Sequence, residues 1–229
     1  MTWRDGRSIG SAIMLAMLVS AATTASGAAQ GSPCVGHSVA RLIDALRAYR
    51  AATTAGDLQE RLRLQRSLAE AADIATTVLR TDASPEAEGA RRAIAAIRLG
   101  LEGDPSQLAF AEATLAAVVD GQPVPDGDSL PLVPDLDANS LLDRMAAEAT
   151  ALREAVAAGD ASQALTAQGE LLNDAWLIEL MFRYVPTERA QHVRWAIDNL
   201  RAGPPGDASR LEATAWVFDR LAHSGAGAH

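Results

Sequence analysis

Apolar residues recur along the chain at helical spacing from about residue 39 onward. Positions separated by three or four residues lie on one face of a helix, so this period is typical of amphipathic helices. The apolar positions in the first half are Leu42, Ile43, Leu46 and Tyr49; Leu62, Leu68, Ala72, Val78 and Leu79; Ile94, Ile97 and Leu101; and a shorter segment from about Pro105 to Val119. No segment has the period-two, β-branched pattern of a strand. We therefore predict an all-α fold.

The second half of the chain repeats the pattern of the first. When the sequence is shifted by 103 positions, Arg41–Ala111 aligns with Arg144–Thr214 without a gap. Identical residues occupy 22 of the 71 aligned positions, against roughly six expected by chance from the composition. The apolar positions of the second copy include Leu142, Met145 and Leu152; Leu165, Leu171 and Leu172; Val193, Ile197 and Leu200; and Leu211, Val217 and Phe218. The sequence therefore predicts two tandem copies of a four-helix module, a helical repeat or bundle-like fold.

These patterns divide the chain into six segments. We predict a signal peptide at 1–29, a flexible leader at 30–38, helical module 1 at 39–119, an acidic Pro-rich linker at 120–139, helical module 2 at 140–222 and a disordered tail at 223–229. The linker contains four prolines and five acidic residues, a composition that favours a solvated connection over a helix or a calcium loop.

The N-terminus has the features of a secretory signal. Arg4 and Arg7 precede the mostly apolar run Ile9–Ala22, and the small residues of "TASGAA" suit cleavage after Ala28 or Ala29. The apolar run is short for a membrane span. We therefore expect an exported periplasmic protein that is not an integral membrane protein after cleavage, with an uncleaved anchor as the alternative.

The charge and the cysteine content exclude several classes of protein. The formal net charge is −9, every basic residue except histidine is arginine, and no basic stripe is present, which is unlike a nucleic-acid binder. A single cysteine, Cys34, cannot form an internal disulfide. The folded state therefore depends on packing.

Four Gly-Asp pairs recur at equivalent places in the two copies. They are Gly56-Asp57 and Gly103-Asp104 in the first copy, and Gly159-Asp160 and Gly206-Asp207 in the second. Glycine adopts the left-handed conformation that ends a helix, and aspartate accepts hydrogen bonds from the free amides that begin the next one. We interpret these pairs as helix-turn caps rather than as a phosphate or metal site.

The sequence contains no recognisable catalytic or metal-binding motif. Cys34 and His37 lie close together, but no second pair completes a metal site. Glu170 and Asp174 share a helix face, which solvent exposure explains without acid–base chemistry. His192 has no predicted partner. We therefore predict that the protein is not an enzyme and binds no cofactor or metal, and the role of Cys34 stays open.

Two glutamines are candidates for partner contacts. Gln65 and Gln168 occupy equivalent positions, each three residues from a leucine on both sides, so each interrupts an inward-facing apolar stripe. A buried amide needs a hydrogen-bond partner. One alternative is that each glutamine bonds a neighbouring helix and fixes its register, and the other is that it meets the backbone of another protein.

Aromatic residues distinguish the two copies. Beyond the predicted signal peptide, every tryptophan lies in the second copy, and the aromatic set there is Trp176, Trp195, Trp216, Phe182, Tyr184 and Phe218. The positions equivalent to the tryptophans in the first copy are Asp73, Arg92 and Ala113. These aromatic residues either pack in the core of module 2 or form a partner-binding surface, because Trp and Tyr are common interface anchors.

The pattern resembles the N-terminal part of the MotC family of periplasmic bacterial motility proteins. The resemblance rests on "VARLIDALRAYRAATTAGDLQERLRLQRSL" and "ARRAIAAIRLGLEGDPSQLAFAEA", with Gly56-Asp57, Gln65 and the Gly103-Asp104-Pro105 turn followed by Leu108. It covers roughly Val39–Ala111 and, more weakly, Leu142–Thr214, where Ala208 replaces the proline. This chain is shorter than such proteins and has a repeat in place of their C-terminal half. The resemblance implies an exported helical protein without an active site that binds the periplasmic part of the flagellar stator. A small-ligand or metal-binding bundle centred on the tryptophans is the alternative.

Overall fold

The computed structural model describes residues 33–125 and 137–224, and all regular secondary structure in these ranges is helical. The helices are α1 (Pro33–Ala55), α2 (Leu58–Leu79), α3 (Pro85–Leu101), α4 (Pro105–Val119), α5 (Ala138–Ala158), α6 (Ala161–Phe182), α7 (Glu188–Ala202) and α8 (Ala208–His223). The predicted all-α fold is confirmed for the part of the chain that the structure describes.

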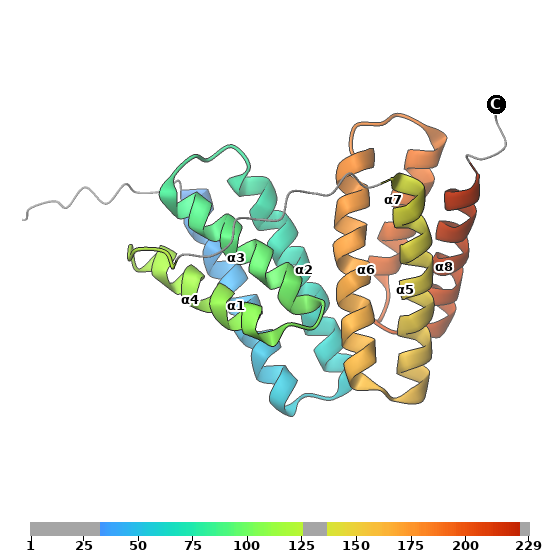
Figure 1. Ribbon diagram of the computed structural model, residues 1–229, viewed down its shortest axis with the longest axis horizontal. Helices are drawn as coiled ribbons and strands as arrows, with labels where there is room; N and C mark the ends of the chain where they lie inside the picture. Colours follow the sequence, from blue (N-terminus) through green and yellow to red (C-terminus); the bar gives the residue numbers. More distant parts are fainter. Residues whose placement is uncertain (1–32, 126–136, 225–229) are drawn as a thin grey trace, which may run out of the picture.

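The helices lie in two neighbouring groups, α1–α4 and α5–α8 (Figure 1). In the first group α1 packs against α2 and α4, and α3 packs against α2 and α4. In the second, α5 packs against α6 and α8, and α7 packs against α6 and α8. The two groups meet where α6 contacts α2 and α3, so α2 and α6 are the central helices of the molecule.

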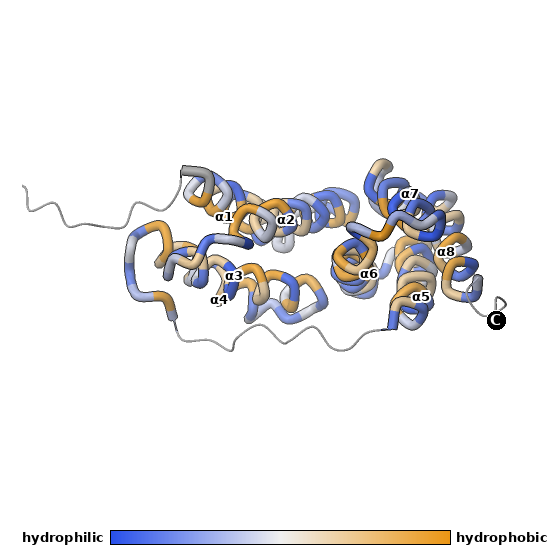
Figure 2. The backbone as a smooth tube through the Cα atoms, turned by 90° about the horizontal axis from the view of Figure 1, so that it is seen from above, coloured by the Kyte–Doolittle hydropathy of each residue, from blue (hydrophilic) through white to orange (hydrophobic). Residues whose placement is uncertain are grey.

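The apolar faces of all eight helices enclose one continuous core, and the apolar segments of the tube in Figure 2 mostly face neighbouring helices. Its largest buried side chains include Leu42, Ile97, Leu142 and Phe218. Many other core positions are alanines, whose small side chains allow neighbouring helices to approach closely. Burial of this apolar surface is the main source of stability in a chain without a disulfide.

The first helix begins earlier than we expected. Residues 30–38 were predicted to form a flexible leader, but α1 starts at Pro33. The reason is that Val35 and Val39 are only 4% and 1% exposed, so they extend the apolar stripe of α1 by more than one turn. The predicted signal peptide (1–29), residues 126–136 of the linker and residues 225–229 of the tail lie outside the described residues.

Aspartates cap five of the described helices, and four of these aspartates belong to the Gly-Asp pairs. Asp57 accepts a hydrogen bond from the amide of Glu60, and its equivalent Asp160 accepts from Gln163. Later in each half, the aspartate bonds an amide only two residues further along the chain. Asp104 accepts from the amide of Ser106, and the amides that bond Asp207 include that of Ser209.

The glycines that precede these caps differ in conformation. Gly103, Gly159 and Gly206 have φ angles of 121°, 70° and 79°, the region that favours glycine. Gly56 departs from the left-handed conformation that we expected, because its φ is not positive. A side chain there would instead place a Cβ atom 2.9 Å from the carbonyl oxygen of Ala52, so close approach of the preceding turn explains this glycine.

None of the helices in the described residues combines the length and the apolar character needed to cross a membrane.

Candidate interaction site

Trp195 on α7 and Trp216 on α8 are the two most exposed tryptophans of the described chain. Their side chains are 56% and 59% exposed. The buried face of α7 consists of Ala190, Val193, Ala196, Ile197 and Leu200, and that of α8 includes Leu211, Thr214, Phe218 and Leu221. Trp195 and Trp216 fall between these positions, so the helical period directs both indoles away from the core.

The two tryptophans line one groove, which we call the α7–α8 groove. It has a volume of about 480 Å³ and is lined by Glu188, Arg189, His192, Trp195, Trp216, Val217, Arg220, Leu221 and Ser224. Such a volume lies within the range of small-ligand and peptide-side-chain pockets. The groove therefore combines an apolar aromatic surface with charged residues at its margin.

Arginines border the aromatic surface of the groove. The guanidinium carbon of Arg220 lies 5.1 Å from the ring centroid of Trp216, a cation–π distance. Arg189 donates a hydrogen bond to the side-chain oxygen of Asn139 at the start of α5, which fixes its position beside the groove. The charged residues at the margin are thus two arginines and one acidic residue, Glu188, in a chain whose net charge is −9.

The other predicted aromatic residues lie elsewhere. Trp176 is half-buried, with the guanidinium carbon of Arg98 3.8 Å from its ring centroid. Phe182 is half-buried against the core at the end of α6, and Tyr184, which follows it, is 80% exposed. None of these three residues lines the α7–α8 groove. Phe218 is fully buried in the core. The structure thus brings Trp195 and Trp216 together but does not form a single cluster of all six aromatic residues.

Gln65 and Gln168 lie inside the molecule, where α2 meets α6. Gln65 Nε2 donates to the carbonyl oxygen of Leu165 over 2.7 Å, and Gln168 Nε2 donates to that of Leu62 over 2.6 Å. Gln168 Nε2 also lies 3.1 Å from Gln65 Oε1. Both glutamines are almost completely buried, at 0% and 2% exposure. They therefore bond a neighbouring helix of the same chain, and a partner protein would reach them only if α2 and α6 separated.

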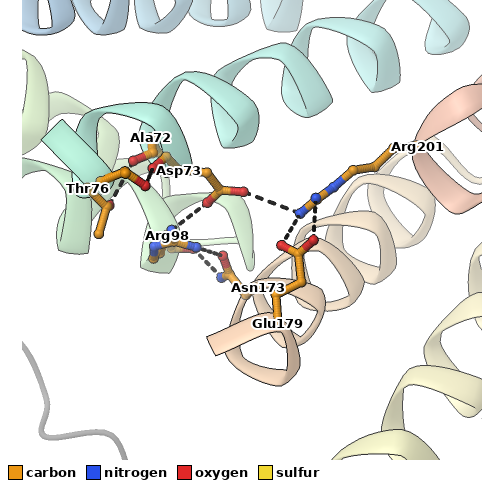
Figure 3. A network of polar contacts seen from close by, with 8 residues as sticks. Ala72, Asp73, Thr76, Arg98, Asn173, Glu179 and Arg201 are labelled. Carbon is orange, nitrogen blue, oxygen red and sulfur yellow. Dashed lines mark hydrogen bonds and ion pairs between the residues drawn. The ribbon is translucent and has the colours of Figure 1, made fainter. Parts of the chain in front are cut away.

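A polar network extends this contact along α2 and α6 (Figure 3). Asp73 on α2 accepts from Arg98 over 2.7 Å and lies 3.4 Å from Arg201. Arg201 also forms a two-bond pair with Glu179, and Asn173 donates to the carbonyl oxygen of Arg98 over 3.0 Å. Burial lowers the pKa of Arg98, and Asp73 opposes that change. The network ties α3 and α7 to the two central helices.

A second charged group lies between α5 and α6, and the sequence analysis did not find it. Asp174 is 5% exposed, which corrects the expectation that solvent exposure explains its place beside Glu170. Its carboxylate accepts 2.9 Å and 2.5 Å bonds from Arg144. Burial and the neighbouring Asp174 raise the pKa of Glu148 to about 8. The packing of α5 against α6 brings these residues together, and no sequence motif signals it.

Among the described side chains, one group of aspartates and a histidine has a spacing that could hold a metal ion. Oxygen and nitrogen atoms of Asp143, Asp219 and His223 lie within 4.8 Å of one another, and all three residues are exposed. His223 Nδ1 is already 2.8 Å from the carbonyl oxygen of Asp219. His192 lines the α7–α8 groove, whereas Cys34 and His37 lie at the start of α1.

Comparisons of the chain with protein-family models, with curated proteins and with solved structures give no significant match. The function of the α7–α8 groove is therefore inferred from its own residues.

Proposed function

We propose that this protein is an exported, non-enzymatic helical scaffold that binds a protein partner in the periplasm through the α7–α8 groove. One observation supports this most strongly: Trp195 and Trp216 are more than half exposed and line a single groove. Large exposed aromatic side chains are costly in water and are common anchors of protein interfaces. The positions equivalent to them in the first half are Arg92 and Ala113, so the groove belongs to the second half alone.

The scaffold consists, in this proposal, of two copies of one four-helix module. Reciprocal bonding of Gln65 and Gln168 supports this, because Leu62 and Leu165, which accept their bonds, are themselves 103 positions apart. A second pair of contacts shows the same exchange: Asp73 lies beside Arg201, and Trp176, the equivalent of Asp73, lies beside Arg98, the equivalent of Arg201. Contacts in which equivalent residues exchange places are the signature of two-fold symmetry. The two modules then meet as the halves of a symmetric dimer would.

The resemblance of the helical pattern to the MotC family makes a stator component of the flagellar motor the specific partner to test. The basic margin formed by Arg189 and Arg220 favours a partner segment with acidic residues next to an apolar or aromatic anchor. The predicted signal peptide at 1–29 supports a periplasmic interaction.

A crosslinking experiment in intact cells tests the proposal. The chain contains no lysine, so a carboxylate- or photo-reactive reagent is needed. We expect envelope-machine proteins, stator components in particular, to co-purify with the tagged protein and to be lost from the Trp195→Ala, Trp216→Ala double variant. A matched control is Ile74→Ala, which removes a 46% exposed apolar side chain from α2. Recovery of the same proteins from the double variant would count against the groove, and recovery of the protein alone would count against a scaffold.

The alternative is that the groove binds a small ligand or a metal ion. Its concave shape and the nearby Asp143, Asp219 and His223 favour this candidate. Titration of the protein with zinc or with small aromatic ligands would then change tryptophan fluorescence in a saturable, stoichiometric manner. The change would disappear in Trp195→Ala for a ligand in the groove, and in His223→Ala for a metal.

A further inference from the structure

A second cavity lies between the end of α1, the start of α2, the turn from α3 to α4 and the start of α6. Its volume is about 640 Å³. The residues that matter for its chemistry are Tyr49, Arg50, Arg61, Ser162 and Thr166, and no acidic side chain lines it. Trp195 and Trp216 are not part of it, so it is separate from the α7–α8 groove.

Arg61 is a cation without a partner at this cavity. Its guanidinium makes no ion pair and no hydrogen bond with a described residue, and its Nε atom is buried without a partner. Arg50, by contrast, pairs with Glu112 outside the cavity. A buried guanidinium hydrogen that finds no acceptor within the protein is costly, so a bound acceptor would stabilise it.

Tyr49 provides an independent indication of a ligand. Only 4% of the residue is exposed, and it lines the cavity. Its hydroxyl makes no hydrogen bond with a described residue. Tyr49 and Arg61 line the same cavity. Burial raises the pKa of Tyr49, and the charge of Arg61 opposes that rise. A neutral hydroxyl donor and an unpaired guanidinium therefore face the same space.

The start of α6 adds further donors. Ala161 and Ser162 line the cavity at the first turn of this 22-residue helix, where amides precede the first helical hydrogen bond. The side chain of Asp160 accepts a hydrogen bond from the amide of Gln163, and not from the amides of Ala161 and Ser162. The floor is apolar and includes Leu101, Leu108 and Leu165.

We propose that this cavity binds a small organic anion, whose carboxylate or phosphate group pairs with Arg61 and accepts a hydrogen bond from Tyr49, and whose apolar body lies on the leucines. The polar side supplies donors and positive charge, as oxyanion recognition requires. The volume suits a small molecule rather than a bare inorganic ion.

Calorimetric titration of the full mature chain with phenyl phosphate, benzoate and benzyl alcohol tests this site. The first two probes share an aromatic body and differ in the anion, whereas benzyl alcohol carries no charge. We expect saturable binding of at least one anion and none of benzyl alcohol. Tighter binding of phenyl phosphate would identify a phosphate site, and tighter binding of benzoate a carboxylate site.

Variants separate the site from general charge effects. Arg61→Gln is expected to weaken binding of the anion at least about tenfold, because it removes the unpaired charge. Arg63→Gln removes the same charge from an exposed residue of α2 that pairs with Glu60, and it should leave binding unchanged.

Tyr49→Phe, expected to weaken binding several-fold, provides a second variant if Arg61→Gln does not fold by circular dichroism. The proposal is overturned if neither anion binds saturably, or if Arg61→Gln and Arg63→Gln bind the probes equally. Failure here leaves the crosslinking test of the α7–α8 groove unaffected.

Discussion

At the scale of single residues, the contact between Gln65 and Gln168 is the most specific feature of the interior. Each amide group donates a hydrogen bond to a backbone carbonyl of the opposite helix. Removing one side chain leaves polar atoms of its partners buried and unpaired, which costs more than the bond itself contributes.

Replacement of Gln168 by leucine is therefore expected to lower the free energy of unfolding by about 1–3 kcal/mol. Urea denaturation of Gln65→Leu, Gln168→Leu and the double variant measures this. The double variant should lose less than the sum of the two, since the glutamines bond each other. Gln163→Leu, on the exposed face of α6, is the control and should change stability little. Additive losses would show that the two glutamines act independently.

The pKa of Glu148 predicts a dependence of stability on pH. The pKa is raised from 4.5 to about 8 in the folded state, so the folded protein holds this proton more tightly than the unfolded chain. The stabilisation is therefore complete below the unfolded pKa and is lost as pH rises toward about 8. In Glu148→Gln the free energy of unfolding should fall less over this interval, whereas the exposed Glu154→Gln on the same helix should behave like the unmodified protein. Equal slopes for both variants would contradict the assignment.

At the scale of helices, local signals predicted most of what the structure shows. The helical spacing of apolar residues and the Gly-Asp turns located the helices, because both signals depend only on residues that are close together in the sequence. The start of α1 was missed, since Pro33 and the leader composition suggested flexibility while Val35 continues the apolar stripe. The exposure of Trp195 follows from its place in the period of α7, although composition alone did not decide it.

Gly169 of α6 lies in close contact with the end of α3. A Cβ atom there would lie 1.9 Å from the carbonyl oxygen of Leu101 at the end of α3. Gly169→Ala must therefore displace one helix, and we expect a loss of about 3 kcal/mol in the free energy of unfolding. Gly36→Ala in α1 meets nothing within 4 Å and should be neutral or slightly stabilising. Thermal or urea unfolding of the two variants checks this, and equal stabilities would show that α3 and α6 are not in close contact.

At the scale of the whole molecule, the sequence predicted a duplication but not how its halves would meet. The pairing of α2 with α6, the carboxylates between α5 and α6, and the cavity beside Tyr49 all depend on contacts between residues far apart in the chain. No pattern in a single sequence reports such contacts. The α7–α8 groove was predicted only in part. Its two tryptophans were candidates for partner contacts, whereas Arg189 and Arg220 were not.

Export is a further prediction at the scale of the whole chain. If residues 1–29 act as a signal peptide, the mature protein begins at Ala29 or Gln30. Mass spectrometry of the protein recovered from a periplasmic extract should find one of these N-termini. A protein retained in full length in the membrane fraction would favour the uncleaved anchor instead.

The central claim is that a protein partner binds at the α7–α8 groove, and site-specific photo-crosslinking tests it most directly. A photo-reactive phenylalanine analogue is placed at Trp195 in one version of the protein and at the exposed Ile74 of α2 in another. Irradiation of living cells should give a discrete crosslinked product with an envelope protein from position 195 and none from position 74. The absence of a product at position 195, or the same product from both positions, would contradict the proposed interaction site.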